Sequence, residues 1–199
     1  KHPLLIEVTS MNEGQFMPVP VIDVSSAANS GTYEEFATFY TGDPNVTNTF
    51  SDCGILSFCV GSRQATPDRI RIARQLLADR ADVNEKDAKY ARTPLHRLLF
   101  DVYPKPAAFL IEMTHLLLEA GAEVDAEDRF LETPLGYAVR NTKAGTDELR
   151  PLYLDLLHAG ADPRHVNTFG RSPLDYAKEY SWRNGFVDIV REFERGPQQ

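Results

Sequence analysis

A short pattern of residues returns along this chain at a nearly constant distance. Thr93-Pro94-Leu95-His96 is followed 40 residues later by Thr133-Pro134-Leu135-Gly136, and 39 residues after that by Ser172-Pro173-Leu174-Asp175. In each copy a Ser or Thr precedes a Pro, which is typical of a helix N-cap followed by the first helical position. A fixed period of about this length predicts an array of stacked structural repeats.

A second pattern gives the end of each repeat. It consists of two leucines followed by a short turn, and it occurs at 76–84, 117–125 and 156–163. Leu156 lies 23 residues after Thr133, and the same step back from Leu76 reaches Cys53. Residues 53–58 are therefore interpreted as a degenerate repeat start, and the sequence predicts four repeats.

Both patterns resemble the ankyrin-repeat family, whose repeats begin T-P-L-H-x-A and end L-L-x-x-G-A-D-V-N. The resemblance covers residues 50–193 and implies an all-α ankyrin-repeat solenoid of helix-turn-helix repeats with finger-like turns. The period of about 40 exceeds the family's ~33 residues. We expect the excess between the two helices of each repeat, around 61–65, 100–106 and 140–146, on the edge opposite the fingers.

The flanking segments carry no clear copy of the repeat. Residues 1–49 are predicted to be a non-repeat N-terminal segment, with extended stretches at 4–8 and 19–24. Thr32 and Glu35 form the pattern of a capping box. We expect it to open a short helix that buries Phe36, Phe39 and Tyr40 against the first repeat. Residues 194–199 are predicted to be a flexible tail.

Composition limits the partners that the chain could bind. The formal net charge is −8 and the pI is near 5.1, which argues against binding to nucleic acid or to anionic membranes. No apolar run reaches the length of a transmembrane helix. The sequence starts at Lys1, so removal of an export or lipoprotein signal would place the protein in the periplasm, and otherwise it would be cytoplasmic. Cys53 and Cys59 are expected to be buried thiols, because their helical spacing does not suit a disulfide.

No residue set forms a recognisable catalytic or metal-binding motif. His96 occupies the histidine position of the family pattern, and the resemblance implies a structural hydrogen bond to a neighbouring turn. His115 and Glu119 lie one helical turn apart, but a metal site needs further ligands. We therefore expect a non-enzyme with no cofactor and no metal.

Residues near the predicted finger tips are candidates for binding a protein partner. An aromatic residue stands three positions before every repeat start, and aromatic side chains are enriched at interface hot spots. The same row could instead pack one finger on the next. Charged residues directly before the repeat starts could select a partner, or form a solvated rim. The full candidate set is Phe50, Tyr90, Phe130 and Phe169 from the row, Arg92, Glu132 and Arg171 before the starts, and Arg97, Tyr137, Arg140 and Tyr176 on the first helices.

The sequence thus favours a protein–protein interaction module over an enzyme. Its sharpest form is a bacterial immunity or inhibitor protein that neutralises a toxic enzyme, such as a secreted toxin or effector. An intracellular scaffold and a host-directed ankyrin effector are alternatives. A more remote alternative is an enzyme with its site in residues 1–49, although so short a segment cannot form a large pocket alone.

Overall fold

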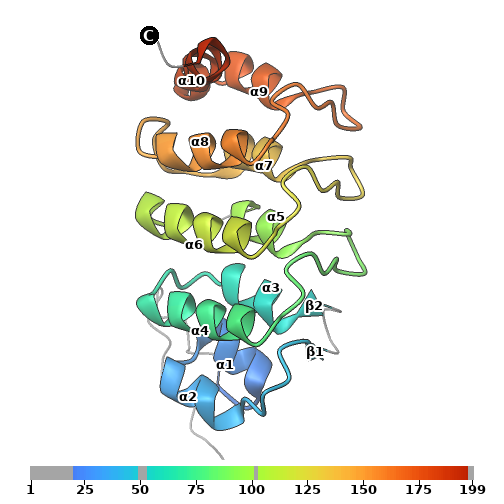
Figure 1. Cartoon of the computed structure of the whole chain (residues 1–199), viewed down its shortest axis with the longest axis vertical. Helices are drawn as coiled ribbons and strands as arrows, with labels where there is room; N and C mark the ends of the chain where they lie inside the picture. Colours follow the sequence, from blue (N-terminus) through green and yellow to red (C-terminus); the bar gives the residue numbers. More distant parts are fainter. Residues whose placement is uncertain (1–19, 49–52, 101–102, 197–199) are drawn as a thin grey trace, which may run out of the picture.

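The protein is a stack of helix pairs. The computed structural model describes residues 20–48, 53–100 and 103–196. In Figure 1 each layer holds an inner helix beside the fingers and an outer helix further away. The inner helices are α3 (Ile55–Val60), α5 (Pro94–Leu99), α7 (Pro134–Asn141) and α9 (Pro173–Glu179), and the outer ones are α4 (Pro67–Ala78), α6 (Ala107–Glu119), α8 (Arg150–His158) and α10 (Asn184–Arg195).

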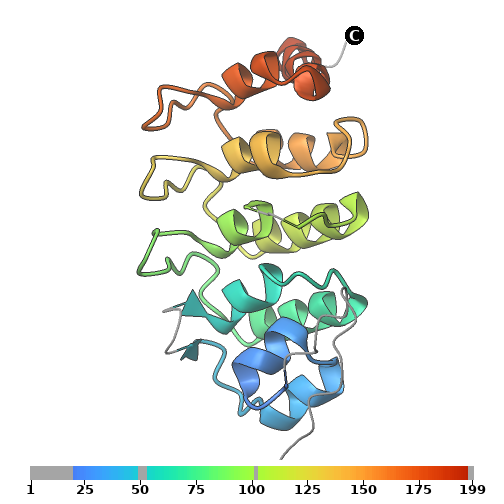
Figure 2. The ribbon, with the colours of Figure 1, turned by 180° about the vertical axis from the view of Figure 1, so that it is seen from behind.

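Each helix packs on its counterpart in the next layer. Inner helices contact inner helices from α3 to α9, and outer helices contact outer helices from α4 to α10. The chain is mostly helical, and its leucines form one continuous core along the stack. Four segments join an outer helix to the next inner helix, and we call them fingers 1 to 4: residues 40–54, 79–93, 120–133 and 159–172. Figure 2 shows fingers 2 to 4 from behind, as parallel projections on the left.

The predicted helix starts are confirmed. Thr93, Thr133 and Ser172 are N-caps, and each side chain accepts a hydrogen bond from a backbone amide in the first turn. Gly121 and Gly160 follow outer helices with φ of 90° and 103°, where a left-handed residue ends a helix at least cost as glycine. The longer connections also lie where they were expected, between α3 and α4, α5 and α6, and α7 and α8.

The N-terminal segment forms a further layer, which the sequence analysis did not foresee. Helix α1 (Val24–Ser30) begins at a capping box of Asp23 and Ser26, and α2 (Tyr33–Phe39) begins at the predicted box of Thr32 and Glu35. Helix α1 packs on α3 and α2 packs on α4, as in the later layers. The extended stretch expected at 19–24 is therefore wrong at Val24, which is helical. The stretch at 4–8 lies outside the described residues.

A row of side-chain hydrogen bonds joins this first layer to the rest. Asn45 Oδ1 accepts from the amide of Asp82 at 2.9 Å, and Asn84 Oδ1 accepts from the amide of Glu123 at 2.8 Å. Asp125 makes the same contact to the next finger. Finger 1 also contains strands β1 (Thr47–Asn48) and β2 (Cys53–Gly54), which pair antiparallel. The boundary predicted at residue 49 lies outside the described residues.

The aromatic residues of α2 divide between the core and solvent. Phe36 is 1% exposed and stacks on Tyr40 at a centroid distance of 4.9 Å, and the Tyr40 hydroxyl donates to Asp79 at 2.8 Å. Phe39 is 37% exposed, so the expectation that it is buried is wrong. It is the last residue of α2.

A buried arginine fastens each end of the stack. Arg69 of α4 donates to the carbonyls of Ala27 and Ala28 at the end of α1. Arg183, in the 3₁₀ turn η1 (Ser181–Arg183), donates to the carbonyl of Val139 at 2.9 Å and to that of Ala144 at 2.9 Å. Helix α10 then runs to Arg195, so the first two residues of the predicted tail, 194 and 195, are helical.

Candidate interaction surface

Fingers 2 to 4 are each closed by one acidic or amide side chain. Asp87 Oδ1 accepts from the amide of Tyr90 in finger 2, and Asp128 Oδ1 accepts from the amide of Phe130 in finger 3. Asn167 Oδ1 accepts from the amide of Phe169 in finger 4 at 2.9 Å. The backbone next to each aromatic residue is therefore fixed by its own finger. The aromatic side chains are presented by ordered turns.

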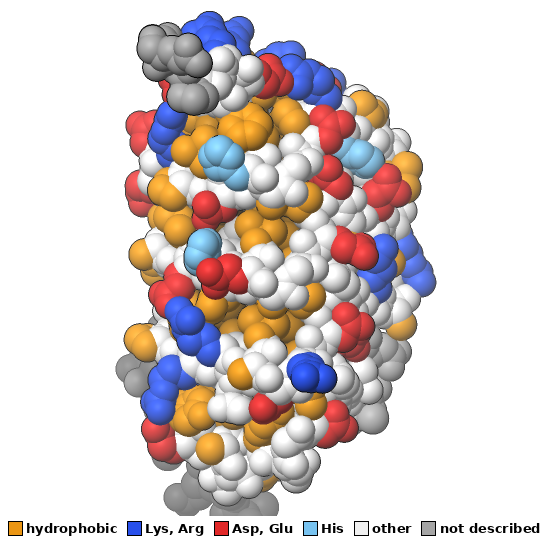
Figure 3. All heavy atoms as spheres, in the orientation of Figure 1, with side chains coloured by type: hydrophobic (Ala, Val, Ile, Leu, Met, Phe, Trp, Pro, Cys, Tyr) orange, Lys and Arg blue, Asp and Glu red, His pale blue; other side chains and the backbone are white. Residues whose placement is uncertain are grey.

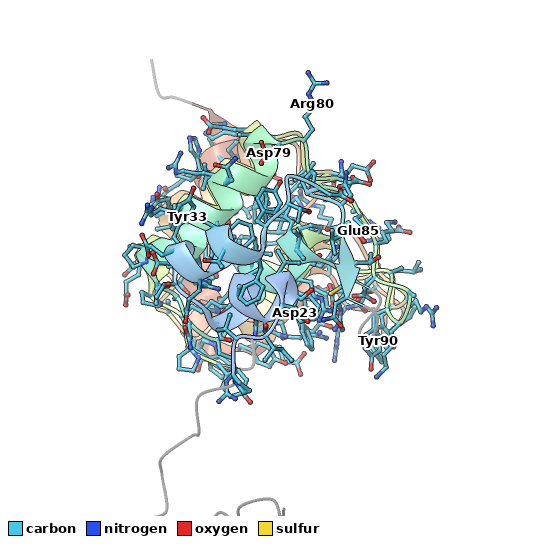
Figure 4. All side chains as sticks on the ribbon, turned by 90° about the horizontal axis from the view of Figure 1, so that it is seen from below. Asp23, Tyr33, Asp79, Arg80, Glu85 and Tyr90 are labelled. Carbon is cyan, nitrogen blue, oxygen red and sulfur yellow. The ribbon has the colours of Figure 1, made fainter. Side chains whose placement is uncertain are left out.

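The aromatic row predicted from the sequence is continuous over the described fingers. The rings of Tyr90 and Phe130 lie 6.2 Å apart, and those of Phe130 and Phe169 lie 5.9 Å apart. Viewed along the stack in Figure 4, Tyr90 lies at the finger edge, on the side away from Tyr33 of α2. Phe50 lies outside the described residues. The row packs finger on finger, and it also reaches solvent, because Phe169 is 64% exposed.

Arg92 and Glu132 are buried between fingers, so the expectation that they form a solvated rim is wrong. Arg92 Nε lies 3.3 Å from Asp128 Oδ2 of the next finger, and its guanidinium lies 3.7 Å from the ring centre of Phe100. Glu132 Oε2 accepts from Asn167 Nδ2 at 2.7 Å. Both side chains hold adjacent fingers together and are not free to meet a partner. Burial raises the pKa of Glu132, and the Asn167 hydrogen bond opposes this shift.

Tyr137 and Tyr176 are buried as well, and each ties an inner helix to its finger. The Tyr137 hydroxyl donates to Asp128 Oδ2 at 2.6 Å, and the Tyr176 hydroxyl accepts from Asn167 Nδ2 at 2.7 Å. Burial, together with the hydrogen bond to Asp128, raises the pKa of Tyr137. The two tyrosines therefore support the surface from below rather than forming it.

Arg97 and Arg140 are the half-buried cations of the inner helices. Arg97 Nε lies 3.7 Å from Asp87 Oδ2, and Arg97 Nη2 lies 3.2 Å from the Cys53 sulfur. Arg140 Nη1 donates to the Tyr176 hydroxyl at 3.2 Å and lies 3.5 Å from Glu132. Exposed cations at the finger tips accompany them: Lys86, Lys89, Arg129 and Arg171. Figure 3 shows basic and acidic side chains together along the finger side.

Trp182 is an exposed aromatic residue that the sequence analysis missed. Its ring stacks on Tyr180 at 4.8 Å, and Tyr180 lies 6.1 Å from Tyr176. The indole is 62% exposed. The sequence could have indicated this residue in two ways. Trp182 is the chain's single tryptophan, and it lies shortly after the last inner helix.

His96 supports the fold in the way that the resemblance implied. The amide of Thr93 donates to Nδ1 at 3.2 Å, so the proton of the neutral ring lies on Nε2, which donates to the carbonyl of Glu132 at 3.1 Å. Burial lowers the pKa of His96 to about 4. The neutral ring thus bridges one inner helix to the next finger.

Within the described ranges, the remaining pockets are small, and the remaining titratable groups do not form a cluster. A polar pocket of about 170 Å³ lies between α1, α3 and α5, and an apolar groove of about 420 Å³ lies between α4 and α6 on the outer-helix face of Figure 3. In the described part of the chain no three His, Cys, Asp or Glu residues gather as metal ligands would. His115 instead pairs with Glu119 at 3.2 Å, and Cys53 and Cys59 are buried and form no disulfide, as predicted.

Comparisons with known proteins give partial similarity. No family model matches the chain. A stretch of 95 residues, 48% of the chain, is 37% identical to Protein glp-1 of Caenorhabditis elegans, and it covers 7% of that protein. The similarity supports the ankyrin-repeat resemblance over that part of the chain only. Across the described helices, none combines the length and apolar character that crossing a membrane requires.

Proposed function

We propose that this chain is an ankyrin-repeat array that acts as a non-enzymatic protein-interaction module. The observation that carries the proposal is the aromatic row of the fingers, which is held by hydrogen bonds within each finger and ends in an exposed phenylalanine. The partner-binding surface consists of the finger tips and the exposed side chains beside the inner helices. A stack of helix pairs presents such a surface along its whole length.

The physical support is preorganisation. An aromatic side chain buries a large area on binding and has few rotatable bonds, so it loses little entropy. The Tyr90 ring is already packed against Phe130, and the Trp182 ring is already stacked on Tyr180. Binding would therefore need little further ordering of these groups. The finger-tip cations Lys89 and Arg129 favour a partner with an acidic patch, although the whole chain carries a net charge of −8.

A more specific form of the proposal is that the partner is a toxic enzyme and that the chain is a bacterial immunity or inhibitor protein. A rigid surface suits stoichiometric inhibition, because the inhibitor pays little to adopt its bound form. A host-directed effector or an intracellular scaffold would use the same kind of surface. The partner's identity, and the compartment in which it works, periplasm or cytoplasm, distinguish these roles.

The test is capture of a partner followed by measured binding of variants. The purified chain should retain a protein at one-to-one stoichiometry, and Trp182→Ala or Tyr90→Ala should weaken the complex by about 2 kcal/mol or more, which is the hot-spot scale. Phe39→Ala is the matched control, because Phe39 is an exposed aromatic residue on α2, away from fingers 2 to 4. Circular dichroism should show that all variants stay folded.

Two results would contradict the proposal. Equal affinity of Trp182→Ala, Tyr90→Ala and the control would place the interface elsewhere. Turnover of a small molecule by the purified chain, abolished by changes in residues 1–49, would favour the enzyme alternative. If a partner is found, inhibition of its activity by an equimolar amount of the chain tests the immunity form.

A further inference from the structure

Fingers 3 and 4 each cover the preceding finger through the same three kinds of contact. Finger 3 lies on finger 2 in this way: the amide of Arg129 donates to the carbonyl of Tyr90 at 2.8 Å, the ring of Phe130 packs on that of Tyr90, and the carboxylate of Asp128 pairs with Arg92. One backbone bond, one aromatic pair and one polar pair therefore define the contact.

Finger 4 repeats these contacts on finger 3. The amide of Thr168 donates to the carbonyl of Phe130 at 2.9 Å, and the ring of Phe169 stacks on that of Phe130 at 5.9 Å. The polar pair is here Asn167 with Glu132, at 2.7 Å. Because the contacts recur, the outer surface of each finger presents a defined pattern of groups to whatever lies on it.

On finger 4 this outer pattern is uncovered. Its aromatic member, Phe169, is 64% exposed, and Val166 beside it is also exposed. Arg171 occupies the position of Arg92, yet its side chain is 51% exposed where that of Arg92 is 7% exposed. Within the described residues its ion pair is with the equally exposed Glu179 at 3.5 Å, which is the weak kind of surface pair.

Helix α10, at the same end of the stack as finger 4, has a charged surface instead of an apolar one. Its exposed residues include Arg191 and Asp188, which pair at 3.0 Å. A further helix pair would have to bury those charges, whereas a turn laid on finger 4 alone would not. At the upper end of Figure 1, finger 4 projects well away from α10, so its outer surface can be reached separately.

We propose that the outer surface of finger 4 is a docking site for a turn of a partner protein that carries an acidic residue two positions before an aromatic residue. The carboxylate would pair with Arg171, the amide of the middle residue would donate to the carbonyl of Phe169, and the aromatic ring would stack on Phe169. Asp128-Arg129-Phe130 has this spacing and makes these contacts on finger 2. Added backbone hydrogen bonds give such sites affinity, and the side-chain positions give them specificity. The inference rests on the proposed function and specifies the contact that Phe169, the exposed end of the aromatic row, would make.

The experiment uses a defined probe, a synthetic peptide that copies residues 121–133 of this chain. Titrated into the full-length, isotope-labelled chain, it should shift the backbone NMR signals of finger 4 in a saturable way. Phe169→Ala or Arg171→Glu in the chain should weaken binding at least ~10-fold, and so should a peptide with D128K. The D128K peptide with the Arg171→Glu chain should regain affinity, because the charge pair is restored in reverse. Arg191→Glu is the matched control, since it reverses an exposed cation on α10 at the same end of the stack.

Several outcomes would overturn the inference. They are the absence of saturable shifts at millimolar peptide, shifts confined to other fingers, equal weakening by Arg191→Glu, and failure of the reversed charge pair to regain affinity. Concentration-dependent dimerisation that Phe169→Ala abolishes would assign the surface to a second copy instead. If a captured partner depends on Trp182 but is insensitive to Phe169→Ala, the proposed function stands and this docking site does not.

Discussion

Gly136 leaves the space that the carboxylate of Glu132 occupies. A Cβ atom on Gly136 would lie 1.9 Å from Glu132 Oε1, which is far inside contact distance. Gly136 stands at the position where another repeat has His96, whose ring bridges to the next finger. In the Gly136 repeat, Glu132 makes the corresponding bridge to Asn167 from within the finger itself.

Gly136→Ala is therefore expected to lower the free energy of unfolding by about 1–3 kcal/mol, as overpacking of a filled site does. The cause is displacement of Glu132 from Asn167, not helix propensity. In a Glu132→Ala background the same change should be neutral or stabilising, because Ala favours a helix by up to ~1 kcal/mol over Gly. Urea unfolding of the four proteins in this cycle measures the effect. The same loss in both backgrounds would show that the carboxylate is not the obstacle.

The N-terminal layer should unfold together with the repeats. Phe36→Ala is expected to cost about 3–5 kcal/mol, because it empties a fully buried aromatic site between α2 and α4. Phe39→Ala, on the same helix, should change stability by ~1 kcal/mol or less. Thermal unfolding monitored by circular dichroism tests this pair. A separate low-temperature transition in Phe36→Ala, with the main transition unchanged, would show that the layer is an independent unit.

His96 should make stability depend on pH. Burial lowers the pKa of His96 to about 4, below the ~6.5 of an unfolded histidine. The unfolded chain therefore takes up this proton first as the pH falls. The stabilisation is complete above pH ~6.5 and is lost between there and about pH 4, by up to about 3 kcal/mol. Urea unfolding of wild type and His96→Gln across this range isolates the effect, since other groups titrate in both proteins. Parallel pH profiles would contradict the assignment.

The two buried arginines should differ in their contribution to stability. Arg183→Met leaves the carbonyls of Val139 and Ala144 without their partner, and we expect a loss of about 3–5 kcal/mol. Arg69→Met should cost less than half as much, because Nε and Nη2 of Arg69 already have no hydrogen-bond partner among the described residues. Chemical denaturation of both variants provides the comparison. An equal loss would mean that packing of the side-chain stem, not the hydrogen bonds, sets the cost.

The sequence predicted the parts of the fold that depend on local chemistry. Thr93 with Pro94 defines a helix start whatever lies around it, and the left-handed turn at Gly121 follows from a single residue. Helix α1 was missed because Val24–Ser30 is rich in Ser, Ala and Asn and has no apolar stripe. Asp43-Pro44-Asn45 does match the end of a repeat, and it was the available signal for the extra layer.

The candidate surface was less predictable, because it depends on contacts between layers. The aromatic row followed from its spacing, but the burial of Arg92 did not. Its partner Asp128 lies 36 residues away on the next finger, and a single sequence gives no sign of such a pair. Charged residues next to a turn are usually exposed. The expectation that Arg92 is exposed was therefore wrong, because two fingers enclose its side chain.

The carbonyl contacts of Arg69 and Arg183 bear on how the stack would come apart in acid. Both end layers are fastened to backbone carbonyls, which do not take up protons as the pH falls. In the middle of the stack, the neutral ring of His96 joins α5 to finger 3 through the carbonyl of Glu132, and burial lowers the pKa of His96 to about 4. Acid would therefore loosen the middle of the stack, while the two arginine contacts at its ends would keep both their charge and their acceptors.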